Sequence, residues 1–190
     1  MYRICEKDYI SSNDYSNIFE KYPFPLDTFQ KYAIEAIEKG HNILVAVPTG
    51  SGKSLPGEYA IKKFCENGKK VIYTSPIKAL SNQKHKEFSK KFPGISFGIV
   101  TGDTNNNSDA DCLIMTTEIL WKTLFQTRMK ENKSINADKI ELHFDLKVED
   151  IGAVIFDEFH YINDRFRGHV WKQTVKMLPI EVVQVYLSAT

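Results

Sequence analysis

The sequence predicts an α/β fold in which helices cover both faces of a mainly parallel sheet. Two observations support this prediction: short runs of consecutive apolar residues recur along the chain, and segments of helical periodicity separate them. Strands that are apolar at successive positions are buried on both faces, and strands joined through helices pair in parallel with right-handed crossovers. The expected strands are residues 43–47, 71–74, 97–100, 113–115, 153–156 and 182–187. Ligands of such sheets bind beyond the carboxyl ends of the strands.

Residues 1–23 are predicted to be an N-terminal segment that leads into the single domain formed by residues 24–190. The segment is rich in Tyr, Ser and Asn, and Pro23 and Pro25 fix extended backbone and disfavour a helix before Leu26. The first helix should start after Asp27, which can cap it, and end at Gly40, which can adopt a left-handed conformation. Its apolar face consists of Phe29, Ala33, Ala36 and Ile37.

The composition is that of a soluble globular domain. The 190 residues are 42% hydrophobic and 26% charged, which excludes disordered, collagen-like and disulfide-scaffold proteins. The 25 Lys and Arg residues nearly balance the 24 Asp and Glu residues, so any nucleic-acid contact must be local. Three scattered cysteines fit a reducing compartment. The apolar runs are too short to span a bilayer, so we expect a soluble intracellular protein of the cytoplasm or nucleus without membrane contact.

A glycine-rich segment after the first expected strand has the pattern of a phosphate-binding loop. It consists of Val47, Pro48, Thr49, Gly50, Ser51, Gly52, Lys53 and Ser54, with Val47 at a position where such loops usually carry Gly or Ala. The two glycines let backbone N–H groups turn inward around phosphate oxygens at a helix N-terminus. Lys53 would contact the β- and γ-phosphates of ATP, and the Ser54 hydroxyl would be one ligand of Mg²⁺. The alternative is an ordinary Gly/Ser turn with a solvated lysine.

Two carboxylates, Asp157 and Glu158, follow the expected strand 153–156. Asp157 could hold Mg²⁺ through its water shell, and Glu158 could orient and deprotonate an attacking water, so Lys53, Asp157 and Glu158 are the expected catalytic residues. In isolation, an Asp-Glu pair is more often a solvated turn, and His160 would more often be a hydrogen-bonded loop histidine. We expect the ends of two neighbouring strands to hold the magnesium-bound tail of a purine triphosphate.

Two segments interrupt the alternation of strands and helices. Residues 126–150 are polar at first and then alternate between apolar and polar from Ile140 to Leu146, which predicts a surface insertion containing one half-exposed strand. Residues 105–108, three asparagines and a serine, are predicted to form a loop tip.

In combination, residues 50–54 (GSGKS) and 157–160 (DEFH) resemble the first RecA-like lobe of superfamily 2 helicases of the DExH type. Residues 24–30 are similar to the adenine-reading Q motif, and residues 76–84 to motif Ia of the superkiller-like RNA helicases. Residues 101–103 and 115–120 resemble motifs Ib and Ic, residues 160–171 the extension after the DExH box, and residues 188–190 motif III. The resemblance covers residues 24–190 and implies a three-layer RecA-like P-loop NTPase domain.

The resemblance also implies roles for individual residues. Gln30 would read the adenine edge, Phe24 would pack near the base, and His160, Ser188 and Thr190 would couple hydrolysis to strand movement. The implied contacts to the nucleic-acid backbone are Pro76, Lys78, Ala79, Asn82, Gln83, Thr101, Gly102, Asp103, Thr116, Thr117 and Glu118. Short hydroxyl and amide side chains suit phosphate and 2′-hydroxyl contacts. Without the resemblance, helix capping by the threonines and a solvated lysine would be the simpler interpretation.

Two features depart from the family pattern. Lys172 stands where the family commonly carries an acidic residue, and segment 126–150 is longer than its counterpart. The second RecA-like lobe, which in the family carries arginine fingers and half of the RNA track, is absent from this sequence. A trans-acting arginine contributes ~10³–10⁵ in rate in related phosphoryl transfer, so the lobe alone should be a very poor ATPase.

The leading functional hypothesis is the ATP-binding lobe of an ATP-dependent RNA helicase, which hydrolyses ATP with Mg²⁺ to move 3′ to 5′ along RNA or unwind it. Its partners would be single-stranded RNA, the second lobe and an RNA-processing or decay complex. Two alternatives remain: a nucleotide-gated module that binds RNA or protein without turnover, and a DNA-directed helicase of the same superfamily.

Overall fold

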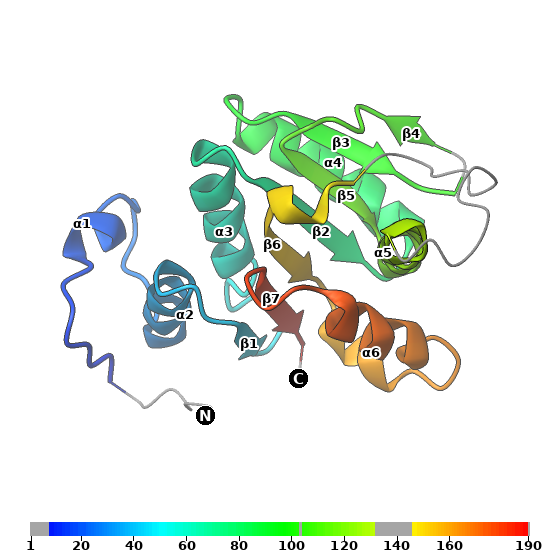
Figure 1. Cartoon of the computed structure of the whole chain (residues 1–190). Coiled ribbons are helices and arrows are strands. Elements are labelled where there is room, and N and C mark those ends of the chain that lie inside the picture. Colours follow the sequence, from blue (N-terminus) through cyan, green and yellow to red (C-terminus); the bar gives the residue numbers. More distant parts are fainter. Residues whose placement is uncertain (1–7, 103, 132–145, 190) are drawn as a thin grey trace.

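Seven strands form one sheet in the order β1-β7-β6-β2-β5-β3-β4 (Figure 1). The computed structural model describes residues 8–102, 104–131 and 146–189. β4 pairs antiparallel with β3, and the other neighbouring strands pair in parallel. The strands are β1 (Ile43–Ala46), β2 (Lys70–Ser75), β3 (Phe97–Val100), β4 (Asn105–Asn106), β5 (Cys112–Thr116), β6 (Ile151–Phe156) and β7 (Val183–Ser188). The predicted mainly parallel sheet is therefore confirmed.

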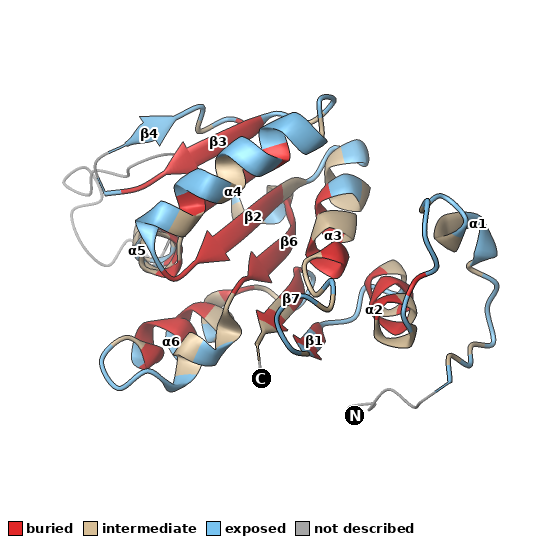
Figure 2. Cartoon of the chain, turned by 180° about the vertical axis from the view of Figure 1, so that it is seen from behind, coloured by how far each residue is buried: buried red, intermediate tan, exposed pale blue. Residues whose placement is uncertain are grey.

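Helices cover both faces of this sheet. The main ones are α2 (Thr28–Glu38), α3 (Leu55–Glu66), α4 (Lys78–Lys91), α5 (Thr117–Glu131) and α6 (Gly168–Met177). Buried side chains of α2, α3 and α4 pack with alternate strand residues such as Tyr73 and Ile155 on one face, which Figure 2 shows from the α3 and α4 side. Leu120 of α5 and Trp171 of α6 pack with the intervening residues, such as Val154, on the other face. The fold is therefore the predicted three-layer arrangement.

The N-terminal segment packs against α2. Tyr32 of α2 accepts a hydrogen bond from the Ile10 N–H and donates one to the Asp8 carbonyl. A single helical turn, α1 (Ser16–Phe19), forms ahead of the two prolines, although no helix is expected before Leu26. This turn ends before Pro23, so proline geometry limits the helix without preventing it.

Strand β4 is the main departure from the predicted elements. The prediction of a loop tip at 105–108 is wrong for its first two residues, which pair with the end of β3. Asn107 then turns the chain with a φ of 56°. The turn lies so close to Gly98 that a Cβ there would be 2.1 Å from the Asn107 carbonyl oxygen. Only glycine fits this position of β3.

The region predicted as an insertion begins as helix. α5 continues to Glu131, so residues 126–131 are helical. The alternating stretch that starts at Ile140 lies outside the described residues up to position 145, and Leu146 is buried. A short 3₁₀ helix, η2 (Val148–Asp150), leads into β6. No helix in the described part of the chain is long and apolar enough to cross a membrane.

Candidate functional site

The segments predicted to carry chemistry gather at the carboxyl edge of the sheet. The glycine-rich loop follows β1, the Asp-Glu pair follows β6, and residues 76, 117 and 188 stand at the ends of β2, β5 and β7 (Figure 1). The expectation that β1 and β6 are neighbours is wrong, because β7 lies between them. The long side chain of Lys53 spans this separation.

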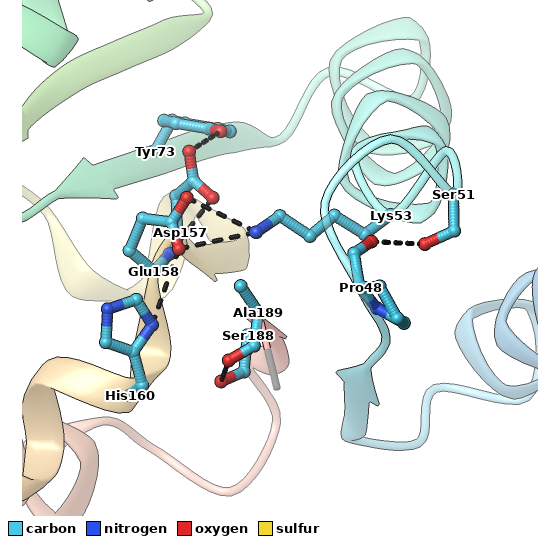
Figure 3. A network of polar contacts seen from close by, with 9 residues as sticks. All are labelled: Pro48, Ser51, Lys53, Tyr73, Asp157, Glu158, His160, Ser188 and Ala189. Carbon is cyan, nitrogen blue, oxygen red and sulfur yellow. Dashed lines mark hydrogen bonds and ion pairs between the residues drawn. The ribbon is translucent and has the colours of Figure 1, made fainter.

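Lys53 joins the loop to the acidic pair. Its Nζ lies 3.2 Å from Glu158 Oε1 and 3.3 Å from Oε2 (Figure 3). The Lys53 side chain is 10% exposed and that of Glu158 is 28% exposed. The ion pair connects residues 105 positions apart in the chain and brings the glycine-rich loop and the acidic pair together.

The path of the glycine-rich loop depends on two glycines with a left-handed backbone conformation. Gly50 and Gly52 have φ values of 88° and 77°, a conformation that side chains with a Cβ rarely adopt. The Ser51 hydroxyl donates to the Pro48 carbonyl within the loop. α3 then begins at Leu55, and the Ser54 side chain makes no cap bond to that helix. The Ser54 hydroxyl is therefore not committed to helix capping, which suits a ligand of the Mg²⁺ that accompanies ATP.

Val47 anchors the start of this loop. Its side chain packs partly buried against the core, so the departure from Gly or Ala is accommodated by apolar contact. Its N–H donates a 3.2 Å hydrogen bond to the Ser188 carbonyl at the end of β7. The loop and the end of β7 are thus joined through the main chain.

Asp157 is buried, and each of its two carboxylate oxygens accepts one hydrogen bond. The Tyr73 hydroxyl donates to its Oδ2 at 2.6 Å, and the Glu158 N–H donates to its Oδ1 at 3.0 Å (Figure 3). Burial raises the pKa of Asp157, the Tyr73 hydrogen bond opposes this effect, and the neighbouring Glu158 charge adds to it. Burial, followed by the Asp157 charge, raises the pKa of Tyr73, which keeps the hydroxyl protonated as a donor. This environment suits a carboxylate that holds a cation through bound water.

The backbone of Glu158 is left-handed, with a φ of 53°. Such a conformation costs about 1–2 kcal/mol for a residue with a Cβ. At this position it accompanies a carboxylate that faces both Lys53 and His160, whose Nδ1 lies 3.4 Å from Glu158 Oε2 (Figure 3). Glu158 therefore stands between the phosphate loop and the 3₁₀ helix η3 (Phe159–Asn163), which contains His160.

The two residues expected at the adenine base differ in their surroundings. Gln30 is 4% exposed; its Oε1 accepts from the Asp27 N–H at 2.9 Å, and its Nε2 donates to the Gly52 carbonyl at 3.3 Å. The first contact completes a capping box at the start of α2, and the second links α2 to the phosphate loop. Phe24 is 50% exposed beside Tyr22, and both line an open hollow of about 440 Å³. A larger cavity of about 560 Å³ lies at the edge of the sheet where β2, β6 and β7 begin, and none of the expected site residues lines it.

The residues expected to contact nucleic acid divide by exposure. The exposed ones are Lys78, Ala79, Asn82, Gln83 and Gly102, and Thr116 and Glu118 are partly buried. Pro76 and Thr117 are buried, and the Thr101 hydroxyl accepts a hydrogen bond from the Thr104 N–H, so these three are placed to support the surface. Asp103 and Thr190 lie outside the described residues.

Sequence reasoning assigned no role to two residues that organise the site. Tyr73 lies within an apolar strand, where its partner Asp157, 84 positions away, leaves no local signal. Arg167 was part of the recognised extension after the acidic pair. Its Nε donates to Glu118 Oε1 at 2.8 Å, and its Nη2 donates to the Pro76 carbonyl. Arg167 thus connects the ends of β2 and β5.

Comparisons with known proteins identify relatives of this chain. Residues 27–190 match the family model described as DEAD/DEAH box helicase. The chain is 46% identical over 174 residues to the antiviral helicase SKI2 of Saccharomyces cerevisiae, covering 92% of this chain and 12% of that protein. It is 40% identical over 171 residues to the exosome RNA helicase MTR4 of Homo sapiens, covering 90% and 15%. The chain therefore spans roughly an eighth to a seventh of these two relatives.

Solved structures show the same fold at lower identity. The DUF1998 helicase MrfA bound to DNA and AMPPNP superposes with a TM-score of 0.68 at 19% identity, covering 99% of this chain and 28% of that one. The UvsW helicase of bacteriophage T4 gives a TM-score of 0.61 at 21% identity, covering 96% and 61%.

Proposed function

The chain belongs to the DEAD/DEAH box helicase family, and we propose on this basis that it is the ATP-binding lobe of an ATP-dependent RNA helicase. The ion pair between Lys53 and Glu158 is the observation that carries the proposal, because it brings the glycine-rich loop and the acidic pair to one point. If a triphosphate bound between them, its β- and γ-phosphates would take the place of the Glu158 carboxylate as the partner of Lys53. Glu158 would then be free to act on water.

In the proposed reaction, each residue has one task. Backbone N–H groups around Gly50 and Gly52 bind phosphate oxygens, and Lys53 neutralises charge at the γ-phosphate. Mg²⁺ would be held by the Ser54 hydroxyl and, through water, by Asp157, and it would neutralise phosphate charge in the bound nucleotide. Glu158 orients a water molecule and accepts its proton as the water oxygen attacks phosphorus and ADP leaves. Tyr73 keeps the Asp157 carboxylate oriented.

RNA is the proposed track, and the contacts would be made by the exposed residues after β2 and β3, including Lys78, Asn82, Gln83 and Gly102. Relatives at 40–41% identity are named as RNA helicases, whereas the neighbour solved with DNA is 19% identical. A second RecA-like lobe and an RNA-processing or decay complex are the proposed partners, and such a role would place the protein inside the cell. We further propose that this lobe alone turns over ATP very slowly, because the arginine fingers of such helicases come from the second lobe.

Two substitutions test the proposal. Lys53→Ala should weaken Mg-ATP binding by about tenfold or more, since it removes a charge-assisted contact of ~1.5–3 kcal/mol. Glu158→Gln should bind Mg-ATP at least as tightly as the unsubstituted chain, because it removes the competing partner of Lys53. Calorimetric titration measures both, and Lys39→Ala, which removes an ion pair elsewhere, is the control.

Hydrolysis is measured after joining the chain to a second lobe. There, Glu158→Gln should abolish RNA-stimulated turnover while retaining ATP binding. Normal turnover by this variant would show that Glu158 is not the base. Binding without turnover in the unsubstituted two-lobed protein would instead favour a nucleotide-gated binding module.

A further inference from the structure

We propose that the loop of residues 164–167, between η3 and α6, adds a base-stacking contact to the nucleic-acid face, with Phe166 as the platform and Arg165 as its cationic neighbour. This inference rests on the proposed RNA-binding function. It assigns a task to two residues that the nucleotide chemistry does not use.

Hydrogen bonds hold this loop in one shape. Asp164 Oδ1 accepts from the Phe166 N–H at 2.9 Å and from the Arg167 N–H at 2.7 Å. The Asp164 carbonyl accepts from the Gly168 N–H at 3.0 Å. Gly168 itself is required by close packing, because a Cβ there would be 2.4 Å from the Ile162 carbonyl oxygen. The loop therefore presents its outward side chains from a fixed backbone.

Arg167 places the loop beside the proposed RNA contacts. Its guanidinium donates to the carbonyl of Pro76, two residues before the start of α4, and to the carboxylate of Glu118 in the first turn of α5. It also lies 5.8 Å from the centre of the Tyr161 ring in η3. Three segments at the carboxyl edge of the sheet thus meet at one side chain, and Phe166 is the residue immediately before it in the chain.

The Phe166 ring is 77% exposed, and the Arg165 guanidinium lies 5.8 Å from its centre. Arg165 makes no ion pair with any residue that the structure describes. An outward aromatic ring flanked by a positive charge matches the platforms on which single-stranded bases stack, where arginine adds a cation–π contact and attracts phosphate. Ile77, which follows Pro76 in the chain, is also exposed, at 43%. The charge and the neighbouring contacts favour RNA over an apolar protein partner.

The test is fluorescence anisotropy with the full chain, a labelled single-stranded oligouridine, and the same oligonucleotide carrying abasic positions. Phe166→Ala should weaken oligouridine binding by about fivefold or more, the lower end of what a stacked base contributes. Phe166→Tyr should retain binding, whereas Phe166→Leu should lose as much as the alanine variant. Ile180→Ala is the matched control, because Ile180 is 92% exposed just before β7 at the opposite edge of the sheet. Mg-ATP affinity should be unchanged in all four variants.

The abasic oligonucleotide identifies the partner of the ring. Its binding should be equal for the unsubstituted chain and Phe166→Ala, and 5-iodouridine in the intact oligonucleotide should crosslink to the peptide that contains Phe166. Unchanged oligouridine binding by Phe166→Ala, full binding by Phe166→Leu, or an equal loss on the abasic strand would overturn the inference and leave the proposed function standing. A chain that binds no RNA at all would overturn both.

Discussion

Replacing Tyr73 by Phe removes the hydroxyl that donates to Asp157 and leaves the aromatic ring in place. Tyr73 is 1% exposed, and its hydroxyl donates to the Asp157 carboxylate, which is 7% exposed. The ring would keep its edge-to-face contact with Phe88 at 5.1 Å. A hydrogen bond to a charged group contributes ~1.5–3 kcal/mol, so the free energy of unfolding at neutral pH should fall by about 2 kcal/mol. Because Oδ1 keeps its bond from Glu158, a larger loss is not expected.

Urea unfolding followed by circular dichroism measures this change. A loss of about 2 kcal/mol corresponds to a midpoint lower by about 1 M. Tyr186→Phe is the matched control, because the Tyr186 hydroxyl donates to the neutral amide of Gln184, a bond worth only ~0.5–1.5 kcal/mol. If the two variants lost the same stability, or Tyr73→Phe lost none, the Tyr73 hydroxyl would not be supporting a buried charge. Mg-dependent ATP binding should also weaken in Tyr73→Phe alone, since only that variant removes a bond that orients Asp157.

Three further outcomes are expected. Gly98→Ala should lower the free energy of unfolding by ~3 kcal/mol or more in urea titrations, because the new Cβ would meet the Asn107 carbonyl oxygen. Gly94→Ala is the control: the space around its Cβ is open, so the free energy of unfolding should change by under ~1 kcal/mol. Gln30→Ala should cost about 1 kcal/mol, read as a lower melting temperature, since it breaks the capping box of α2 and the bond to the phosphate loop. Burial raises the pKa of Cys65 to about 12, so at pH 8 its thiol should react with a disulfide reagent at least ~10-fold more slowly in the folded chain than in urea. Peptide mass spectrometry measures this reaction.

The sheet could be predicted because its strands carry their own signal. Every residue of β6 is buried, as a continuous apolar run between two helical layers requires. β4 has no such signal: it consists of two exposed asparagines, whose backbone pairs antiparallel with β3. The position of β7 between β1 and β6 is likewise a matter of long-range pairing, which no local pattern encodes.

The phosphate loop and the acidic pair could be predicted because their chemistry demands particular residues at adjacent positions. In the structure, Lys53 Nζ lies 3.2 Å from Glu158 Oε1, so the two motifs are close in space. The supporting residues could not be found in this way. Tyr73 resembles any aromatic residue of a buried strand, and Thr117 resembles a surface hydroxyl until the packing of α5 shows that it is fully buried. The partner of Tyr73, Asp157, is 84 positions away in the chain.

The hydrogen bond from the Val47 amide to the Ser188 carbonyl joins two backbone segments that are far apart in the sequence. β1 lies at the edge of the described sheet and pairs with β7. A displacement of the glycine-rich turn can therefore reach the sheet through α3, which packs against β2, β6 and β7, and also through this main-chain hydrogen bond. The rate at which the Val47 amide exchanges its proton for deuterium would report on that route directly. This contact between main-chain atoms supplements the side-chain contact between Lys53 and Glu158.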